Sequence, residues 1–133
     1  MRQEDIHIRL RNHKEWYNGT RGSGKLVLCE SNLKGIDIGG FNFQHAEILG
    51  VDFSEAYLRS ADFRNTICNY TSFRRSNLVC ANFHFAYCKY VDFTGADLSG
   101  ASFFYADLIG AIFKDAILKN TVFRDCIGHP DSW

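Results

Sequence analysis

The sequence is poor in proline and carries no net charge. Its one proline, Pro130, stands almost at the end of the 133 residues, and 15 lysines and arginines balance 15 aspartates and glutamates. Proteins that bind nucleic acid usually have a strongly basic surface, and imitation of DNA needs a strongly acidic one. The charge balance therefore argues against direct binding of nucleic acid and against a strongly acidic mimic of DNA.

Long apolar runs are also missing. No stretch approaches the roughly 20 apolar residues that span a bilayer. The first residues, MRQEDIHIRLRNHKEW, lack the continuous apolar centre of a secretory signal. We therefore expect no membrane contact and a cytoplasmic location.

Disulfide and zinc motifs are absent as well. The cysteines are odd in number, and no two of them form a C-x-x-C pair, so the sequence indicates neither a disulfide framework nor a zinc site. We expect reduced thiols that serve as small apolar residues. The five are Cys29, Cys68, Cys80, Cys88 and Cys126.

The N-terminal segment shows an apolar stripe at helical spacing, which predicts a helix over residues 3–18 with Gly19 as its C-terminal stop. A short strand over residues 6–10 is the competing interpretation. We prefer the helix, because Trp16 extends the helical stripe but not the strand. The stripe consists of Ile6, Leu10, His13 and Trp16.

A glycine-rich segment, NGTRGSGK, follows the predicted helix at residues 18–25. It does not match the G-x-x-x-x-G-K-[ST] pattern of phosphate-binding loops, because Leu26 follows Lys25. We predict a connector without a binding role.

From residue 26 to residue 127 an apolar residue returns at every fifth position, usually with a small or β-branched residue two positions before it. Residues 91–110, for example, read VDFTG-ADLSG-ASFFY-ADLIG. A period of five fits neither the roughly 3.6 residues of a helical turn nor the alternation of a strand, so it indicates a structural repeat. No insertion interrupts the fives, and a long binding loop on the repeat is therefore not expected.

The fives resemble the pentapeptide repeat proteins, whose motif A-[DN]-L-x-x is seen here as ADFRN, ANFHF, ADLSG and ADLIG. The His13–Trp16 segment also looks like the short N-terminal helix that often precedes such repeats. The resemblance implies an all-β fold, a right-handed quadrilateral parallel β-helix in which four fives make one turn. The central residue of each five and the small residue two before it would point inward.

The residue types at positions twenty apart are consistent with a turn of four fives. Phenylalanine and aliphatic residues then separate into columns, as expected if identical side chains stack through a core. The predicted ladders are Phe53, Phe73, Phe93 and Phe113; Phe43, Phe63, Phe83, Phe103 and Phe123; and Leu58, Leu78, Leu98 and Leu118.

We expect three parts in the chain: a capping helix and glycine-rich loop over 1–25, the β-helix over 26–127, and a C-terminal cap over 128–133. About five turns at ~4.8 Å each would give a rod roughly 24 Å long, and both of its ends need covers. Pro130 and Trp133, together with Ile127, are placed to cover the last turn.

No catalytic residue, metal ligand or cofactor site is predicted. No two histidines fall at metal-ligand spacing on one element, and the aspartates of the motif face solvent in the family. Cys68 and Cys88 would stack about 4.8 Å apart between Cα atoms, close enough for a disulfide. Their column neighbours Ile48 and Leu108 favour free thiols in a core.

Aromatic residues gather at outward positions of the middle turns. An exposed aromatic patch is typical of a protein interface, whereas the alternative is a set of scattered surface aromatics. The candidate partner-binding patch is Tyr70, Phe85, Tyr87, Tyr90, Phe104 and Tyr105.

The outward residues of the last turn are apolar, where earlier turns carry mostly polar ones. This suggests a dimer interface, and some members of the resembled family dimerise through their C-terminal turns. Alternatively, β-branched residues strengthen the final strands. The candidate residues are Ile112, Ile117, Val122 and Ile127.

The sequence thus predicts a non-enzymatic, protein-binding or structural module with an unidentified protein partner, and a homodimer as one of its forms. The alternative is a DNA-mimicking protein that binds DNA gyrase, as some quinolone-resistance members of the family do. Those members resemble longer, acidic rods, whereas basic residues such as Arg74 and Lys89 interrupt the acidic positions here. An acyltransferase with a left-handed β-helix would have a six-residue period, which the fives exclude.

Overall fold

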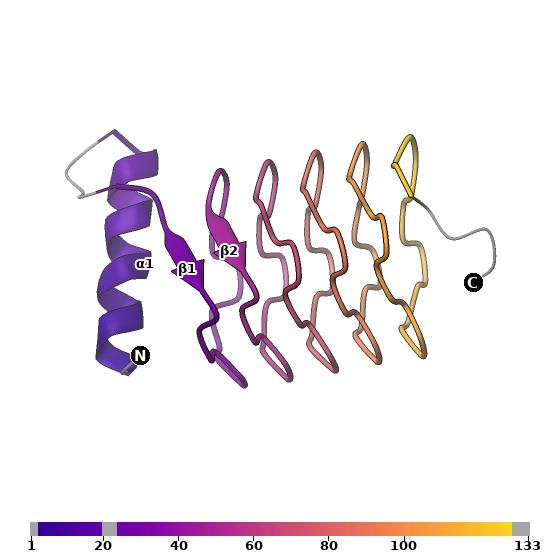
Figure 1. Ribbon diagram of the computed structural model, residues 1–133, viewed down its shortest axis with the longest axis horizontal. Helices are drawn as coiled ribbons and strands as arrows, with labels where there is room; N and C mark the ends of the chain where they lie inside the picture. The colour runs from indigo at the N-terminus through magenta and orange to yellow at the C-terminus, as the bar shows by residue number, and fades with distance from the viewer. Residues whose placement is uncertain (1–2, 20–23, 129–133) are drawn as a thin grey trace.

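The computed structural model describes residues 3–19 and 24–128. In these residues it contains one helix, α1 (Gln3–Tyr17), and two short strands, β1 (Val27–Cys29) and β2 (Glu47–Leu49), which pair in parallel. Figure 1 shows α1 standing across one end of a stack of similar coils, with the C-terminal part of the chain at the opposite end. The glycine-rich connector at 20–23 and the tail with Pro130 and Trp133 lie outside the described residues.

Twenty residues make one turn of the stack. Parallel pairing at this offset runs from β1 and β2 through isolated bridges to the last pair, Asp107 and Ile127. Between coils, the Phe83 amide donates to the Ser102 carbonyl at 2.7 Å, and the Ser102 amide donates to the Ala81 carbonyl at 3.1 Å. The chain bends again soon after each bridge, so most pairs are too short to form named strands. The predicted solenoid with 20-residue turns is confirmed.

The last residue of each five forms a corner with a positive φ, 68° at Gly95 for example. The corner is closed by the Ala96 amide, which donates to the Phe93 carbonyl at 3.0 Å. The aspartate of the motif supports the same corner, since the Thr94 amide donates to Asp92 Oδ1 at 2.9 Å. An Asp or Asn side chain that accepts from the amide two residues on is a common turn former. Five motif aspartates form this bond and support backbone turns: Asp52, Asp62, Asp92, Asp97 and Asp107.

The core is built from the predicted ladders. Phe63 stacks on Phe83 with ring centroids 4.7 Å apart, and Phe73 stacks on Phe93 at 5.4 Å. The two columns meet edge to face, as Phe83 and Phe93 do at 5.7 Å and 87°. All four rings are fully buried. Stacked and edge-to-face pairs each add about 0.5–1.5 kcal/mol to the gain from burial, so the ladders both fill and align the coils.

The last coil differs from this pattern. Its central residues Phe113, Leu118 and Phe123 pack against the core but are only partly buried. The reason is position, because no further coil follows them in the described part of the chain.

Helix α1 packs on the first coil through Ile6, Leu10 and His13, which are buried as predicted, and the strand alternative is wrong. Trp16 lies beside His13 in the same stripe, with the two ring centroids 5.6 Å apart, but 39% of Trp16 is exposed. Phe41 occupies an inward position that is small in most other fives. Its ring lies between the helix and the first coil, with its centroid 6.0 Å from that of His13.

The stability of the chain should fall as the pH drops below about 6.5, because His13 is buried. Its Nδ1 accepts the Leu26 amide at 2.9 Å, and its Nε2 is buried without a hydrogen bond to any described residue. Burial lowers the pKa of His13 more than the nearby backbone of Asn42 and Gln44 raises it. The unfolded chain therefore takes up the proton first as the pH falls, which favours unfolding.

Urea unfolding between about pH 7.5 and pH 5.5 tests this expectation. His13→Asn keeps an acceptor for the Leu26 amide but cannot titrate, so its free energy of unfolding should depend less on pH than that of the wild type. His7→Asn, at an exposed position of the same helix, is the control and should keep the wild-type slope. Equal slopes for His13→Asn and wild type would contradict the role of His13.

Candidate interaction surface

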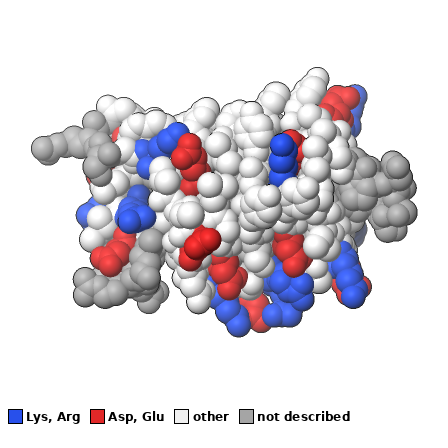
Figure 2. Space-filling view, in the orientation of Figure 1, with Lys and Arg blue, Asp and Glu red and all other residues white. Residues whose placement is uncertain are grey.

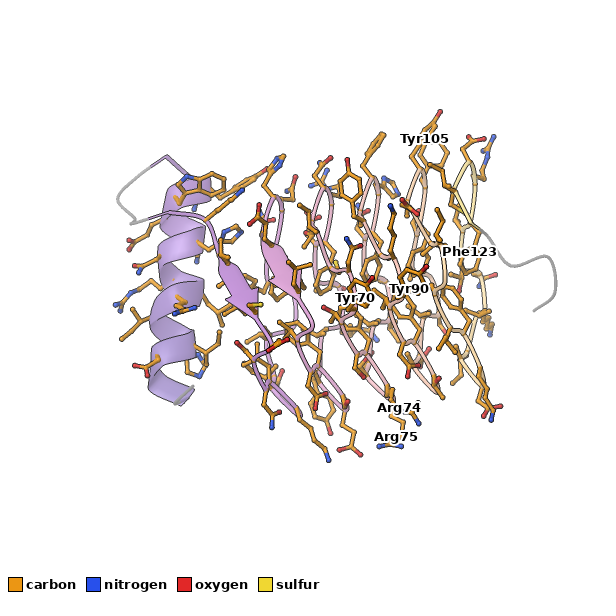
Figure 3. The ribbon with its side chains drawn as sticks, viewed as in Figure 1. Tyr70, Arg74, Arg75, Tyr90, Tyr105 and Phe123 are labelled. Carbon is orange, nitrogen blue, oxygen red and sulfur yellow. The ribbon has the colours of Figure 1, made fainter. Side chains whose placement is uncertain are left out.

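The predicted aromatic residues lie on and around one side of the solenoid, which we call the aromatic face. It is the face that begins with β1 and β2 and continues through residues 66–70, 86–90 and 106–110. Tyr87 lies on it, the four residues Tyr70, Phe85, Tyr90 and Tyr105 are corners at its edges, and Phe104 lies beside Tyr105 on the adjoining side. Figure 3 shows Tyr70 and Tyr90 in the middle of this view and Tyr105 at its upper edge. Phe104 is half-buried, and the other five residues of the predicted patch are between 48% and 65% exposed.

The 20-residue register arranges four of these aromatics in two stacked pairs along the edges of the face. Tyr70 stacks on Tyr90 with ring centroids 5.3 Å apart, and Phe85 stacks on Tyr105 at 5.2 Å. Phe104 meets Tyr105 edge to face at 4.4 Å. Five of the six predicted residues thus form two separate groups, Tyr70 with Tyr90 and Phe85 with Tyr105 and Phe104.

All four stacked residues occupy corners with positive φ: 63° at Tyr70, 60° at Phe85, 57° at Tyr90 and 59° at Tyr105. This conformation costs about 1–2 kcal/mol for a residue with a Cβ, and each stacked pair regains only about 0.5–1.5 kcal/mol. Glycine and asparagine form other corners of the same solenoid at lower cost. The turns do not require aromatic residues. Glutamate, serine, arginine, cysteine and aspartate also occupy corners with a positive φ, so the backbone conformation alone does not distinguish the aromatic corners, and their stacking does.

The remainder of the aromatic face is largely uncharged. Leu49 and Ile109 are exposed on it, two residues that the sequence pattern did not single out because the position after the central residue follows no rule. Its charges include two ion pairs, Lys25 with Glu47 at 3.1 Å and Lys89 with Asp107 at 3.7 Å. Figure 2 shows the contrast between this mostly white surface and the charged lower edge.

The lower edge carries paired charges. Arg74 binds Asp92 at 2.9 Å, and Arg75 lies 3.5 Å from Glu55, both between neighbouring coils. Exposed pairs of this kind contribute little to stability. They leave no continuous acidic surface here, so the aromatic face is the distinctive feature of this view.

The four apolar residues predicted for a dimer interface are between 39% and 59% exposed in the last coil. Because they are five residues apart, they point from four different sides and form a ring around the C-terminal end. Each is tied to the preceding coil, as the Ile112 amide is to the Val91 carbonyl at 2.9 Å. We call this feature the terminal ring.

The described residues hold no group of three His, Cys, Asp or Glu side chains suited to a metal. The cysteines are free thiols, and Cys68 and Cys88 are fully buried. Burial raises the pKa of the Cys88 thiol, so it stays protonated and unreactive. The described part of the chain also contains no helix of the length and apolarity that a membrane crossing requires.

A family model for pentapeptide repeats matches residues 56–87 and 81–120, with eight copies of the repeat. The chain belongs to the pentapeptide repeat family. A solved structure from the Arabidopsis thaliana thylakoid lumen, also a pentapeptide repeat protein, is 27% identical with a TM-score of 0.58, over 70% of this chain and 61% of that one. The present chain thus spans less than two thirds of that relative.

A pentapeptide repeat protein from Nostoc PCC 7120 has the same fold, with a TM-score of 0.52 and 23% identity over 74% of this chain and 77% of that one. A plasmid-mediated fluoroquinolone resistance protein reaches a TM-score of only 0.41 at 16% identity, covering 77% of this chain and 72% of that one. This last likeness is too weak to carry a functional argument. No curated protein matches the chain.

The expected cytoplasmic location is contradicted by the Arabidopsis relative, which comes from the thylakoid lumen. The five-residue repeats specify core packing and turns, which are the same in the cytoplasm and in the thylakoid lumen, so they do not predict a location. The cytoplasmic assignment is therefore withdrawn.

Gly110 supports the stacked pair of Tyr70 and Tyr90, and Gly110→Ala should disturb it. A Cβ at residue 110 would clash with Tyr90 Cδ1 and Cε1, so the ring must move. The matched control is Gly35→Ala, which has a similar φ of 73° but no atom within 4 Å of the new Cβ. Both variants should lose about 1 kcal/mol from the positive φ.

Only Gly110→Ala should lose the additional stacking energy, up to about 1.5 kcal/mol, together with the ring-current shift that Tyr90 imposes on residue 110 in proton NMR. Urea unfolding measures the difference between the two variants. Equal losses in both would show that Tyr90 does not rest on Gly110.

Proposed function

We propose that the chain is a non-enzymatic, protein-binding module whose partner docks on the aromatic face. The proposal includes the finer architecture expected from the family: a right-handed rod of about five turns over residues 26–127, capped by residues 1–25 and 128–133. The observation that supports it best is the pair of ordered aromatic stacks on an otherwise lightly charged face.

Aromatic side chains are the usual anchors of protein interfaces, because they bury much area and lose little conformational entropy. Stacking already restrains the rings of Tyr70, Phe85, Tyr90 and Tyr105, so a partner would meet a preorganised surface. The zero net charge and the paired surface charges favour a protein partner over a polyanion.

The gyrase-binding alternative is supported by no specific feature of the surface. Arg74 and Arg75 pair with Asp92 and Glu55 along the charged edge, and the acidic groups do not form an uninterrupted track. A duplex mimic would need such a track. We therefore do not propose it.

The docking proposal is tested by partner capture from the native host with immobilised protein. Phe85→Ser combined with Tyr105→Ser removes one stacked pair from the surface and should reduce capture at least tenfold while the fold is kept. Tyr57→Ser is the control, because Tyr57 is also more than half exposed but lies on another side. Equal capture by the double variant and the control would rule out the aromatic face as the docking site.

We propose further that the terminal ring mediates a homodimer. A second copy stacked on this end would cover part of the four exposed aliphatic residues and of the partly buried core residue Leu118, which removes apolar surface from water. Light scattering after size-exclusion chromatography should give about twice the monomer mass of 15.2 kDa at high micromolar concentration. Ile117→Lys should restore the monomer, and a wild-type monomer at that concentration would disprove the dimer.

A further inference from the structure

Helix α1 covers only part of the first coil. There Arg9 Nη1 donates to the Val27 carbonyl at 3.2 Å, and His13 accepts the Leu26 amide at 2.9 Å. Beside the C-terminal end of α1, a cavity of about 390 Å³ separates the helix from the coil. It is lined by Lys14, Tyr17, Asn18 and residues 38–42. A cavity of this size lies within the range of ligand sites in proteins.

The floor of this cavity is apolar core surface that α1 leaves partly uncovered. Ile38 is the central residue of its five, yet it is only partly buried, whereas Leu58 and Leu78 in the same column are fully buried. Phe41 beside it is also partly buried. An occupant that covers Ile38 and Phe41 would complete the core at this end, and removing this surface from water favours binding.

The rim of the cavity is an open strand edge. In the next coil, the Tyr57 amide donates to the Ile36 carbonyl at 2.8 Å, and the Ile38 amide donates to the Tyr57 carbonyl at 3.1 Å. Asp37 is the counterpart of Tyr57 in the first coil, and its amide and carbonyl form no hydrogen bond with any residue of 3–19 or 24–128. The Gly39 carbonyl likewise accepts none within these ranges. An unpaired edge of this kind is a template for an added strand.

The mouth of the cavity also carries a lysine that is not engaged in an ion pair with any described residue. This lysine, Lys14, is exposed. Tyr17 beside it stacks on His45 with ring centroids 6.4 Å apart, which holds the wall of the cavity in place. The charge of Lys14 favours an occupant with a carboxylate.

From these features we propose that the junction of α1 and the first coil binds an extended, acidic peptide segment of a partner protein. The segment pairs its backbone with the edge at residues 37–39, places an apolar side chain on Ile38 and Phe41, and turns a carboxylate towards Lys14. A helix, about 10 Å across with its side chains, cannot form these backbone bonds. This site is at the N-terminal end of the rod and does not depend on docking at the aromatic face.

The probe for the proposal is the peptide acetyl-Glu-Val-Glu-Val-Glu-amide, titrated into the ¹⁵N-labelled full chain and followed by NMR. Saturable shifts are expected at the amides of Asp37, Gly39 and Lys14, with slower hydrogen exchange of the Asp37 amide. The neutral peptide acetyl-Gln-Val-Gln-Val-Gln-amide should bind several-fold more weakly. Lys14→Gln should lower the affinity for the glutamate peptide to that of the neutral one.

Two variants at one position separate backbone pairing from side-chain effects. Asp37→Pro removes the edge amide, and proline is tolerated on a strand edge, so binding should fall at least tenfold. Asp37→Ala keeps the amide and removes only a carboxylate that repels the acidic peptide, so it should bind at least as tightly as the wild type. A peptide with N-methylated valines lacks the amides that would form these bonds, so it should fail to bind the wild-type chain. This test does not depend on the folding of Asp37→Pro.

Three outcomes would overturn the proposal. One is the absence of saturable shifts at millimolar peptide, and another is equal affinity of Asp37→Pro and Asp37→Ala. The third is a result with octanoate: if octanoate shifts the same amides and binds Asp37→Pro as tightly as it binds the wild type, the cavity is a site for a small carboxylate ligand.

Discussion

Backbone pairing at a constant offset of twenty residues is the constraint on which the rest of the molecule depends. Each bridge, such as the one between Asn82 and Ser102, places a residue directly beside its counterpart in the next coil. Both the inward-pointing and the outward-pointing side chains therefore form columns along the stack. The inward columns become the stacked phenylalanine ladders, and the outward columns bring distant residues such as Tyr70 and Tyr90 into contact. Core and surface follow from the same hydrogen bonds.

This constraint also explains how far sequence alone could predict the structure. The period of five and its grouping by twenty are repeated many times, so single exceptions did not obscure the ladders, and the aromatic stacks follow from the same register. Features that depend on one packing event were not predictable. The outward position of Trp16, the part of the first coil that α1 leaves open, and the inter-coil pair of Arg74 and Asp92 depend on side-chain placement that no local pattern encodes.

The two ends of the stack differ in how they are covered. At the N-terminal end, Arg9 and His13 of α1 satisfy backbone groups that would otherwise face water or helix without partners. At the C-terminal end, the described chain stops with partly buried core residues such as Leu118 and exposed aliphatic side chains such as Ile117. A repeat stack exposes core and strand edge wherever it stops, so each end is either covered by the chain or open to another molecule.

The repeat limits which residues of this chain are free to contact a partner. The inward positions are filled by the ladders, and the motif aspartates, such as Asp92 and Asp97, are used to close turns. Variation is therefore confined to the remaining outward positions and to the corners. At the corners a positive φ is adopted by glycine but also by glutamate, serine, arginine, cysteine and aspartate, so the repeat leaves the corner residue free to vary. The stacks formed by Tyr70, Phe85, Tyr90 and Tyr105 use this freedom, and in the proposed complex burial of their exposed faces against another protein would favour binding.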